Sequence, residues 1–310
     1  MAVPIAPRAI QDLVARHGGA LKNGAHGVVR RLAPISVAGA GELAPLLAAR
    51  YVEDAPKAVA RGAFLLVDES LAGREDVASL PGWFHPHAAW ALAEVLDTAD
   101  APSDAPVIGE GSVVAPGAVV LPRVRLGKRV TVEPGAVIGA AGFGWATGPD
   151  GKVRAIPQLG GVEIGDDVHV GALTTIASGT LAPTIIRRGA KLDAQVHVAH
   201  NCDVGEDTII AAQTGLAGSV TIGRGVLVGG QVGIADHLRV GDGARIAAKS
   251  GVIGDVAAGS TVAGYPAVER SRWLRGLAEL YRLASQRVSD PPSSSRMRAS
   301  INPPPSGGNR

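Results

Sequence analysis

Histidine is the residue type best suited to move a proton near neutral pH, and four of the eight histidines lie in the second half of this chain. His200 stands in the segment V-A-H-N, with Gly218 following 18 residues later and His237 following 37 residues later. Asp193 takes a position where neighbouring segments mostly have Gly or Ala. An acidic group in such a place needs a partner, so we expect Asp193 to pair with His200.

A repeat of six residues explains these spacings. Every sixth residue from Ile186 to Val252 is aliphatic. The same is true of every sixth residue from Ile108 to Ile138 and from Ile164 to Ile176. A second small or aliphatic residue, such as Val196, usually follows four positions later. An amphipathic helix would repeat at 3.6 residues and a plain strand at two, whereas a period of six fits a short strand plus a corner. Three such units would close one triangular coil, and successive coils would stack about 4.8 Å apart as parallel strands.

The predicted stacking of coils gives the four histidines different positions in the coil. Gly218 should lie one coil beyond His200 in the same column, and His237 on the same edge two coils and one position further. His169 and His197 each immediately precede an inward aliphatic residue, a corner position that predicts a solvated side chain. A zinc site at His197 and His200 is the alternative, although these imidazoles would lie on different faces and no third histidine is suitably stacked.

Two interruptions break the repeat, a long excursion between Ile138 and Ile164 and four extra residues around Ala182 and Pro183. Excursions from a solenoid lie on its surface, where binding groups tend to occur, and the shorter one is equally well read as a tolerated loop.

Residues 1–97 lack the repeat and predict a small α/β domain. We expect a helix at 11–15, a buried strand at 63–67 and a second helix at 87–96. Residues 98–106 predict a linker, and the β-helix should occupy 107–264.

The segment 265–288 predicts a helix with one apolar face, and 289–310, rich in Pro, Ser and Gly, predict a disordered tail. The helix carries five arginines and two glutamates. These arginines suit docking of an acidic partner protein, or the helix simply caps the solenoid, and both interpretations stay open. The arginines are Arg270, Arg272, Arg275, Arg282 and Arg287.

Composition narrows the class of protein. With 30 basic and 28 acidic residues and a formal charge of +2, the chain gives no reason to expect nucleic acid. No apolar signal region and no run of roughly 18 apolar residues is visible, so we expect a cytoplasmic protein without an integral membrane segment. The lone cysteine, Cys202, excludes an intrachain disulfide. It falls at an inward position and should pack in the core.

Several motifs resemble those of the UDP-3-O-acylglucosamine N-acyltransferases of lipid A biosynthesis. They are I-P-Q-L-G (156–160), T-T-I (174–176), D-A-Q-V-H-V-A-H-N (193–201), I-A-A-Q-T-G-L-A-G-S (210–219) and G-G-Q-V-G-I-A-D-H-L-R-V-G-D (229–242). The resemblance covers the repeat domain almost throughout. It extends weakly into the first domain, which is reminiscent of that family's nucleotide-binding domain.

This resemblance implies a left-handed parallel β-helix, mainly β overall, with a small N-terminal α/β domain and a C-terminal helix. It implies a homotrimer with acyl carrier protein as acyl donor and a UDP-sugar as acceptor. The catalytic base maps onto His200, the family's Asp onto Asp193, the oxyanion-hole glycine onto Gly218 and a second active-site histidine onto His237.

Four further residues of the resembling segments are expected to bind substrate: Tyr51, Gln158, Gln195 and Asn201. Neutral His200 would accept a proton from the attacking amine while Asp193 fixes the imidazole tautomer. The Gly218 N–H would stabilise the oxyanion. No metal, cofactor or covalent intermediate is needed, because a thioester is already activated.

The chain departs from the family at Ala177 and Ser178, at Ala194, and at Pro45 and Ala48, where an aromatic residue and an asparagine usually help to hold uridine. These departures keep two rivals open. One is an acyl-CoA-dependent nucleotide-sugar acyltransferase of the same architecture, and the other is a non-catalytic paralogue.

Overall fold

The computed structural model describes residues 2–99, 104–264 and 268–287. The chain forms two compact units, Met1–Tyr265 and Pro266–Arg310. The predicted tail at 289–310 and part of the predicted linker at 98–106 lie outside the described residues.

The first domain contains a six-stranded sheet in the order β1-β3-β4-β5-β6-β2. Strands β3 to β6 run parallel, whereas β1 and β2 pair antiparallel at the two edges. The strands are β1 (Val3–Ala9), β2 (Ala20–Lys22), β3 (Val28–Leu32), β4 (Glu42–Leu46), β5 (Phe64–Asp68) and β6 (Gly82–His85). The buried strand predicted at 63–67 is confirmed as β5.

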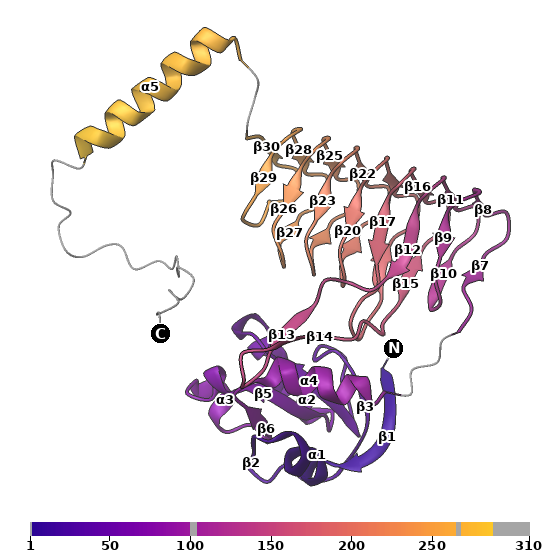
Figure 1. Cartoon of the computed structure of the whole chain (residues 1–310), viewed down its shortest axis with the longest axis vertical. Helices are drawn as coiled ribbons and strands as arrows, with labels where there is room; N and C mark the ends of the chain where they lie inside the picture. Colours follow the sequence, from indigo (N-terminus) through magenta and orange to yellow (C-terminus); the bar gives the residue numbers. More distant parts are fainter. Residues whose placement is uncertain (1, 100–103, 265–267, 288–310) are drawn as a thin grey trace. The chain divides into compact units, whose positions relative to one another are not determined.

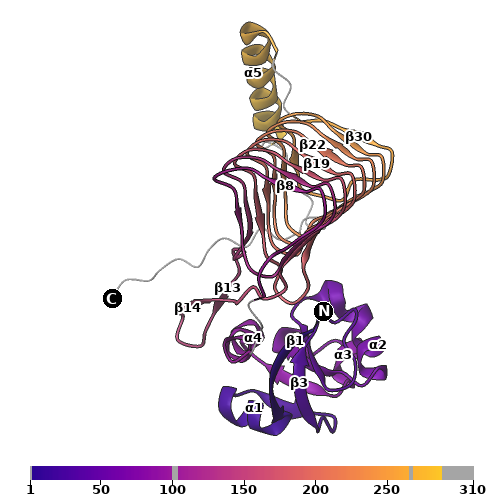
Figure 2. The same cartoon turned by 90° about the vertical axis from the view of Figure 1, so that its right-hand side faces the viewer.

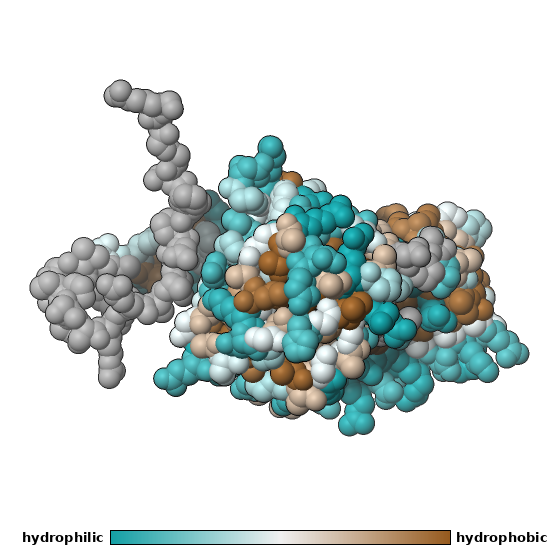
Figure 3. All heavy atoms as spheres, turned by 90° about the horizontal axis from the view of Figure 1, so that it is seen from below, coloured by the Kyte–Doolittle hydropathy of each residue, from teal (hydrophilic) through white to brown (hydrophobic). Residues whose placement is uncertain are grey.

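Helices give this sheet a core on each face. Leu66 packs into one core, which contains residues of α1 and α4, while Leu65 and Val67 pack into the other, which contains residues of α2 and α3. The helices are α1 (Ile10–His17), η1 (Ala49–Asp54), α2 (Ala55–Ala60), η2 (Glu69–Leu71), α3 (Glu75–Ala78) and α4 (Ala88–Asp97). Both helices predicted from the sequence are confirmed, as α1 and α4. Seen from this domain's side, hydrophobic residues are scattered among hydrophilic ones (Figure 3).

The second domain is a three-sided parallel β-helix whose coils stack one on another (Figures 1 and 2). The first side contains β7 (Val107–Ile108), β10 (Val124–Leu126), β15 (Val162–Ile164), β18 (Thr184–Ile186), β21 (Asp203–Val204), β24 (Thr221–Ile222) and β27 (Arg239–Val240). The second side contains β8 (Val113–Val114), β11 (Thr131–Val132), β16 (His169–Val170), β19 (Lys191–Leu192), β22 (Ile209–Ile210), β25 (Leu227–Val228), β28 (Arg245–Ile246) and β30 (Thr261–Val262). The third side contains β9 (Val119–Val120), β12 (Val137–Ala140), β17 (Thr175–Ala177), β20 (His197–Val198), β23 (Gly215–Leu216), β26 (Gly233–Ile234) and β29 (Gly251–Val252).

The strand register confirms the repeat of three hexads. Val198 pairs with Leu216, and Leu216 pairs with Ile234, so partners are 18 residues apart. These inward aliphatic residues are at most 3% exposed. The second inward position is buried as well, and where it is a threonine, as at Thr208, the hydroxyl donates to the Gly223 carbonyl at 2.7 Å. A polar residue fits the core there because its hydrogen bond is made.

The corners of the coils are turned by residues in the left-handed backbone region. Asn201 (φ 60°), Ser219 (φ 62°) and His237 (φ 60°) occupy equivalent corners between the third and first sides in successive coils. Gln195 (φ 59°) and Gln213 (φ 62°) occupy those between the second and third sides. This conformation is uncommon for residues other than glycine, and here the stacked ladders on both sides hold it in place.

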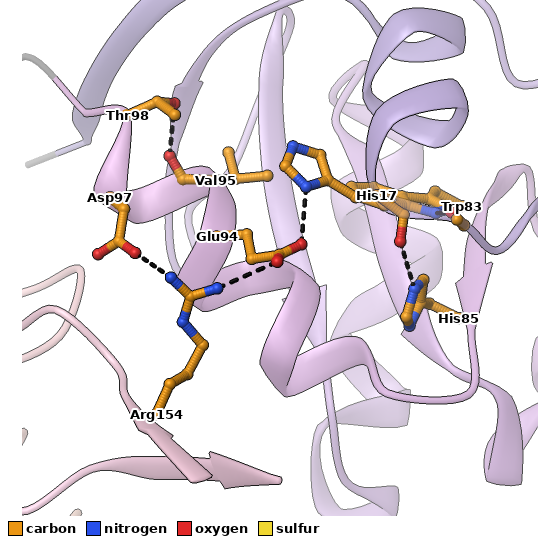
Figure 4. A network of polar contacts seen from close by, with 9 residues as sticks. His17, Trp83, His85, Glu94, Val95, Asp97, Thr98 and Arg154 are labelled. Carbon is orange, nitrogen blue, oxygen red and sulfur yellow. Dashed lines mark hydrogen bonds and ion pairs between the residues drawn. The ribbon is translucent and has the colours of Figure 1, made fainter. Parts of the chain in front are cut away.

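The long excursion folds into a hairpin that contacts the first domain. Its strands are β13 (Trp145–Thr147) and β14 (Val153–Ala155). Arg154 on β14 forms ion pairs with two carboxylates of α4, at 3.1 Å to Glu94 and also to Asp97 (Figure 4). The guanidinium lies over the ring of Trp90 at 4.9 Å, and Glu94 also bonds His17 at 2.8 Å.

We expect Arg154→Ala to lower the free energy of unfolding by about 1–2 kcal/mol, between the values for exposed and for buried ion pairs. The Arg154 and Glu94 side chains are only 27% and 28% exposed, so removing the cation leaves a partly desolvated carboxylate. Denaturant unfolding measures the change, and limited proteolysis in 145–155 should accelerate. Lys152→Ala is the control, because its ion pair on the same hairpin is exposed. Equal stability of both variants would contradict this prediction.

The second unit contains α5 (Arg270–Arg287), which confirms the predicted C-terminal helix. Its apolar residues Trp273, Leu280 and Leu283 are exposed in the single chain. Among the described residues, no helix combines the length and the apolar character needed to cross a bilayer.

Candidate functional site

His200 lies at the corner between β20 and β21, with its imidazole held between two glycines. A Cβ added at Gly218 would lie 2.7 Å from Cε1 and 2.8 Å from Nε2 of the ring. A Cβ added at Gly142, in the excursion, would lie 2.5 Å from the His200 Cβ. A Cβ at either position would force the imidazole or the backbone to shift, so the two glycines allow the ring to keep this position. The predicted stacking of Gly218 on His200 is confirmed.

Gly218 has a backbone donor available beside this ring. Its carbonyl accepts the His237 N–H at 2.9 Å, but within the described residues its own N–H makes no hydrogen bond. An N–H group that is fixed by a rigid coil and left unpaired is suited to bind an oxyanion.

Asp193 does not reach His200, which corrects the pairing expected from the sequence. Its carboxylate accepts the N–H of Ala194 at 2.7 Å and the N–H of Ala212 at 3.1 Å. It therefore satisfies backbone donors at the corner between the second and third sides, whereas His200 lies at the next corner. Asp242 does the same for the Arg224 N–H at 2.9 Å. Within this chain Asp193 cannot fix the His200 tautomer.

Asn201 is the side chain that contacts the His200 ring, with 3.0 Å between Asn201 Nδ2 and His200 Nδ1. Its amide also bonds Thr180, whose N–H donates to Oδ1 at 2.7 Å. Thr180 in the short bulge and Gly142 in the excursion are site residues that the sequence analysis missed. Their signal was the pair of interruptions themselves, because both loops return to the same corner.

The two predicted glutamine ligands have other partners in the structure. Gln158 is 6% exposed and bonds the Ile156 carbonyl at 2.8 Å and the Thr180 hydroxyl at 2.9 Å. Gln195 lies at the other corner and accepts from Gln213 at 2.8 Å, in a ladder that continues to Gln231 at 2.7 Å. Gln158 therefore supports the Thr180 loop next to His200, whereas Gln195 lies at a different corner of the coil.

His237 and Tyr51 meet across the two domains. The Tyr51 hydroxyl, carried by η1, lies 3.1 Å from His237 Nδ1, and the two rings contact edge to face. Asp236 lies 3.7 Å from the other ring nitrogen of His237. This contact brings the predicted nucleotide-binding tyrosine to the same edge of the β-helix as His200.

Cys202 packs in the core as predicted. Its side chain is 1% exposed and its Sγ contacts the Ala217 carbonyl at 3.1 Å. Burial raises the pKa of the thiol to about 12, which leaves no thiolate to act as a nucleophile.

A groove of about 490 Å³ runs along the third side of the β-helix. Gly215, Gly233 and Gly251 occupy its outward positions in successive coils, and a Cβ added to any of them would meet nothing within 4 Å. The groove extends from His197 to Ile253. His197 itself bonds the Thr175 hydroxyl at 2.7 Å.

Three histidines at this edge have pKa values below the ordinary 6.5. Burial lowers the pKa of His197, His200 and His237 by disfavouring the charged ring. For His200 the positive charge of a protonated His197 lowers the pKa further, while a hydrogen bond to the Phe143 backbone opposes the shift. His200 is therefore neutral at pH 7, as a proton acceptor must be.

We expect activity that depends on neutral His200 to persist below pH 6.5 and to fall only as pH passes the lowered pKa. Stability follows the same sign. As pH falls, the histidine of the unfolded chain is protonated before that of the folded chain. The contribution of the neutral ring to the free energy of unfolding is therefore complete above the unfolded-state pKa of about 6.5, and it is lost as pH falls through the lower folded-state pKa. NMR titration of the ring protons measures the pKa, and a His200 pKa above 6.5 would contradict this.

The structure is thus a three-sided parallel β-helix built from six-residue repeats. The sequence pattern of the family described as bacterial transferase hexapeptide (six repeats) matches residues 105–140 and 183–218.

The chain is homologous to the UDP-3-O-acylglucosamine N-acyltransferases, which confirms the resemblance predicted from its motifs. It is 49% identical over 112 residues to that protein of Pseudomonas fluorescens (strain Pf0-1), covering 36% of this chain and 32% of the relative. It is 48% identical over 190 residues to that of Anaeromyxobacter dehalogenans (strain 2CP-1 / ATCC BAA-258), covering 60% and 54%. The match thus spans about a third to a half of these relatives.

Among solved structures, LpxA from Acinetobacter baumannii aligns with a TM-score of 0.47 and 26% identity. The alignment covers 57% of this chain and 72% of that one.

Proposed function

We propose that this chain is an N-acyltransferase of lipid A biosynthesis. It would move a (hydroxy)acyl chain from the thioester of acyl carrier protein to the amine of a UDP-3-O-acylglucosamine-like acceptor. The observation that carries the proposal is the neutral His200 ring fixed against Gly218, whose N–H is unpaired within the described residues. The identity of 48% over 190 residues to a protein with that name supports the same activity.

The reaction needs one base and one oxyanion donor. The amine nitrogen attacks the thioester carbonyl, a C–N bond forms, and the carbonyl oxygen becomes an oxyanion that the Gly218 N–H stabilises. His200 accepts the proton of the amine and returns it to the sulfur when the C–S bond breaks. The products are an amide and a free thiol, and the proton that leaves the amine ends on the sulfur. One oxyanion donor is typically worth roughly 3–4 kcal/mol.

Substrate placement follows from the two features beside His200. The glycine-lined groove on the third side is smooth and largely apolar along its length, which suits an extended acyl chain. Tyr51 and His237 supply an aromatic ring and polar groups on the sugar side. We propose a homotrimer, as the resemblance implies, in which a neighbouring subunit covers the exposed edge that carries His200.

The test incubates the purified chain with acyl carrier protein thioester and UDP-3-O-acylglucosamine, and follows the N-acylated product by mass spectrometry. Acyl-CoA replaces the carrier thioester in a second arm, and UDP-N-acetylglucosamine replaces the acceptor in a third. Turnover only with acyl-CoA would favour the CoA-dependent rival. No product in any arm, with no binding of UDP-sugar to the folded protein, would support a non-catalytic paralogue.

Carrier-protein docking should depend on salt. Arg270, Arg272, Arg275 and Arg282 of α5 are exposed, and attraction to an acidic carrier weakens with ionic strength. We expect kcat/KM for the carrier thioester to fall several-fold between low salt and about 0.5 M NaCl. A short acyl-pantetheine thioester, which lacks the carrier, is the control and should change little. Equal salt dependence of both donors would argue against docking on α5.

A further inference from the structure

Four polar groups connect the long excursion to the His200 ring. Gln158 Nε2 donates to the Ile156 carbonyl at 2.8 Å, and its Oε1 accepts the Thr180 hydroxyl at 2.9 Å. The Thr180 Oγ1 in turn accepts Asn201 Nδ2 at 3.1 Å. Asn201 Nδ2 also lies 3.0 Å from His200 Nδ1.

Backbone groups at two points determine the direction of every bond in this series. The Ile156 carbonyl can only accept, so Gln158 must turn its Nε2 to it and present Oε1 to Thr180. The Thr180 N–H can only donate, and it lies 2.7 Å from Asn201 Oδ1. The NH2 group of Asn201 is therefore the end that faces His200, and the amide orientation is fixed by its partners.

An N–H donor at Nδ1 has a chemical consequence for the ring. Nδ1 must accept, so the neutral imidazole carries its proton on Nε2. Protonation of Nδ1 would place two N–H groups head to head, which disfavours the imidazolium. Of the titratable groups among the described residues, His197 lowers the pKa of His200 and supplies no negative charge, while the hydrogen bond to the Phe143 backbone opposes the shift.

We propose that Thr180 and Gln158 are positioning residues that hold the Asn201 amide with its NH2 group toward His200, keeping the substrate-free ring neutral with its proton on Nε2. For the proposed acyl transfer, on which this role in catalysis rests, the consequence is specific. In that tautomer neither ring nitrogen is a free acceptor, because Nδ1 accepts from Asn201 and Nε2, the nitrogen beside Gly218, carries the proton. The ring can accept the proton of the amine only after this network has rearranged. The network thus sets how easily the resting histidine becomes a base.

Nitrogen-15 NMR of histidine-labelled protein without substrate tests this directly. In the wild-type chain the His200 signals should be those of an Nε2–H tautomer with a hydrogen-bonded Nδ1. In Thr180→Val the His200 pKa should rise and the signals should shift toward a mixture of tautomers. Thr180→Ser retains the hydroxyl and should restore both readouts. Gln158→Met breaks the other end of the network and should act in the same direction as Thr180→Val.

Unchanged signals from His169, which lies on the second side of the β-helix, show that each variant is folded. An Nδ1–H tautomer in the wild type would overturn the proposal. So would an unchanged His200 pKa in both Thr180→Val and Gln158→Met, or a Thr180→Ser variant that behaves like Thr180→Val. No acyl donor is present, so the outcome does not depend on whether the chain transfers acyl groups.

Discussion

The His200→Ala variant is expected to lose about 10²–10⁴-fold in kcat for acyl transfer, the range for a positioned general base. KM for the acyl acceptor should change much less, because in the proposed reaction the ring acts only on the amine proton, while the paired Tyr51 and His237 side chains remain in place to contact the acceptor. Steady-state kinetics with saturating thioester donor measure both constants. The β-helix should stay folded, since the side chain lies outside the inward columns.

His169→Ala is the matched control for this substitution. His169 also stands in a β-helix coil, but on the second side, where its ring lies 3.5 Å from Glu133. We expect near-wild-type turnover from that variant. A His200→Ala protein with the wild-type assembly state and near-wild-type kcat would remove His200 from the mechanism.

Adding one methyl group at Gly218 is expected to lower kcat on the order of 10²-fold, the cost of displacing a catalytic group by about 1 Å. The new Cβ would lie 2.7 Å from the His200 ring, so the imidazole must move away from the N–H that is proposed to bind the oxyanion. Gly218→Ala keeps that N–H and removes no polar group. The loss therefore reports the relative placement of base and donor.

Gly254→Ala is the control for replacing a β-helix glycine by alanine without a close contact. A Cβ there meets nothing within 4 Å, and the residue lies at the far end of the β-helix. It should leave kcat unchanged. In Gly218→Ala, His200 ring signals that match the wild type together with full activity would show that the close approach is not needed.

The β-helix could be predicted because every coil has the same requirement for aliphatic residues at its inward positions. An aliphatic residue every six positions must enter a narrow core, and a column such as Val198, Leu216 and Ile234 follows directly from that period. The stacking of Gly218 on His200 followed from the same arithmetic. What the period does not contain is the direction in which corner side chains turn.

The Asp193 pairing was wrong for that reason. From sequence, an acidic residue close to a histidine reads as its partner, but the corner leaves backbone N–H groups unpaired, and Asp193 satisfies those of Ala194 and Ala212. Likewise Thr180 and Gly142 reach His200 through loops that break the repeat, so no spacing rule could place them. The contact between Tyr51 and His237 depends on how two domains pack, which no local pattern specifies.

The three-sided coil also sets which changes in chain length the site can tolerate. An insertion of 18 residues between Gly218 and His237 would add one coil, leave every later residue on its own side, and move the two groups apart by about 4.8 Å. An insertion of six would rotate everything beyond it by one side, sending His237 and the continuation of the glycine groove to another edge. Under the proposed acyl transfer, whole coils can therefore be added or removed only outside the segment from His200 to His237, and the length of the chain within that segment must stay constant.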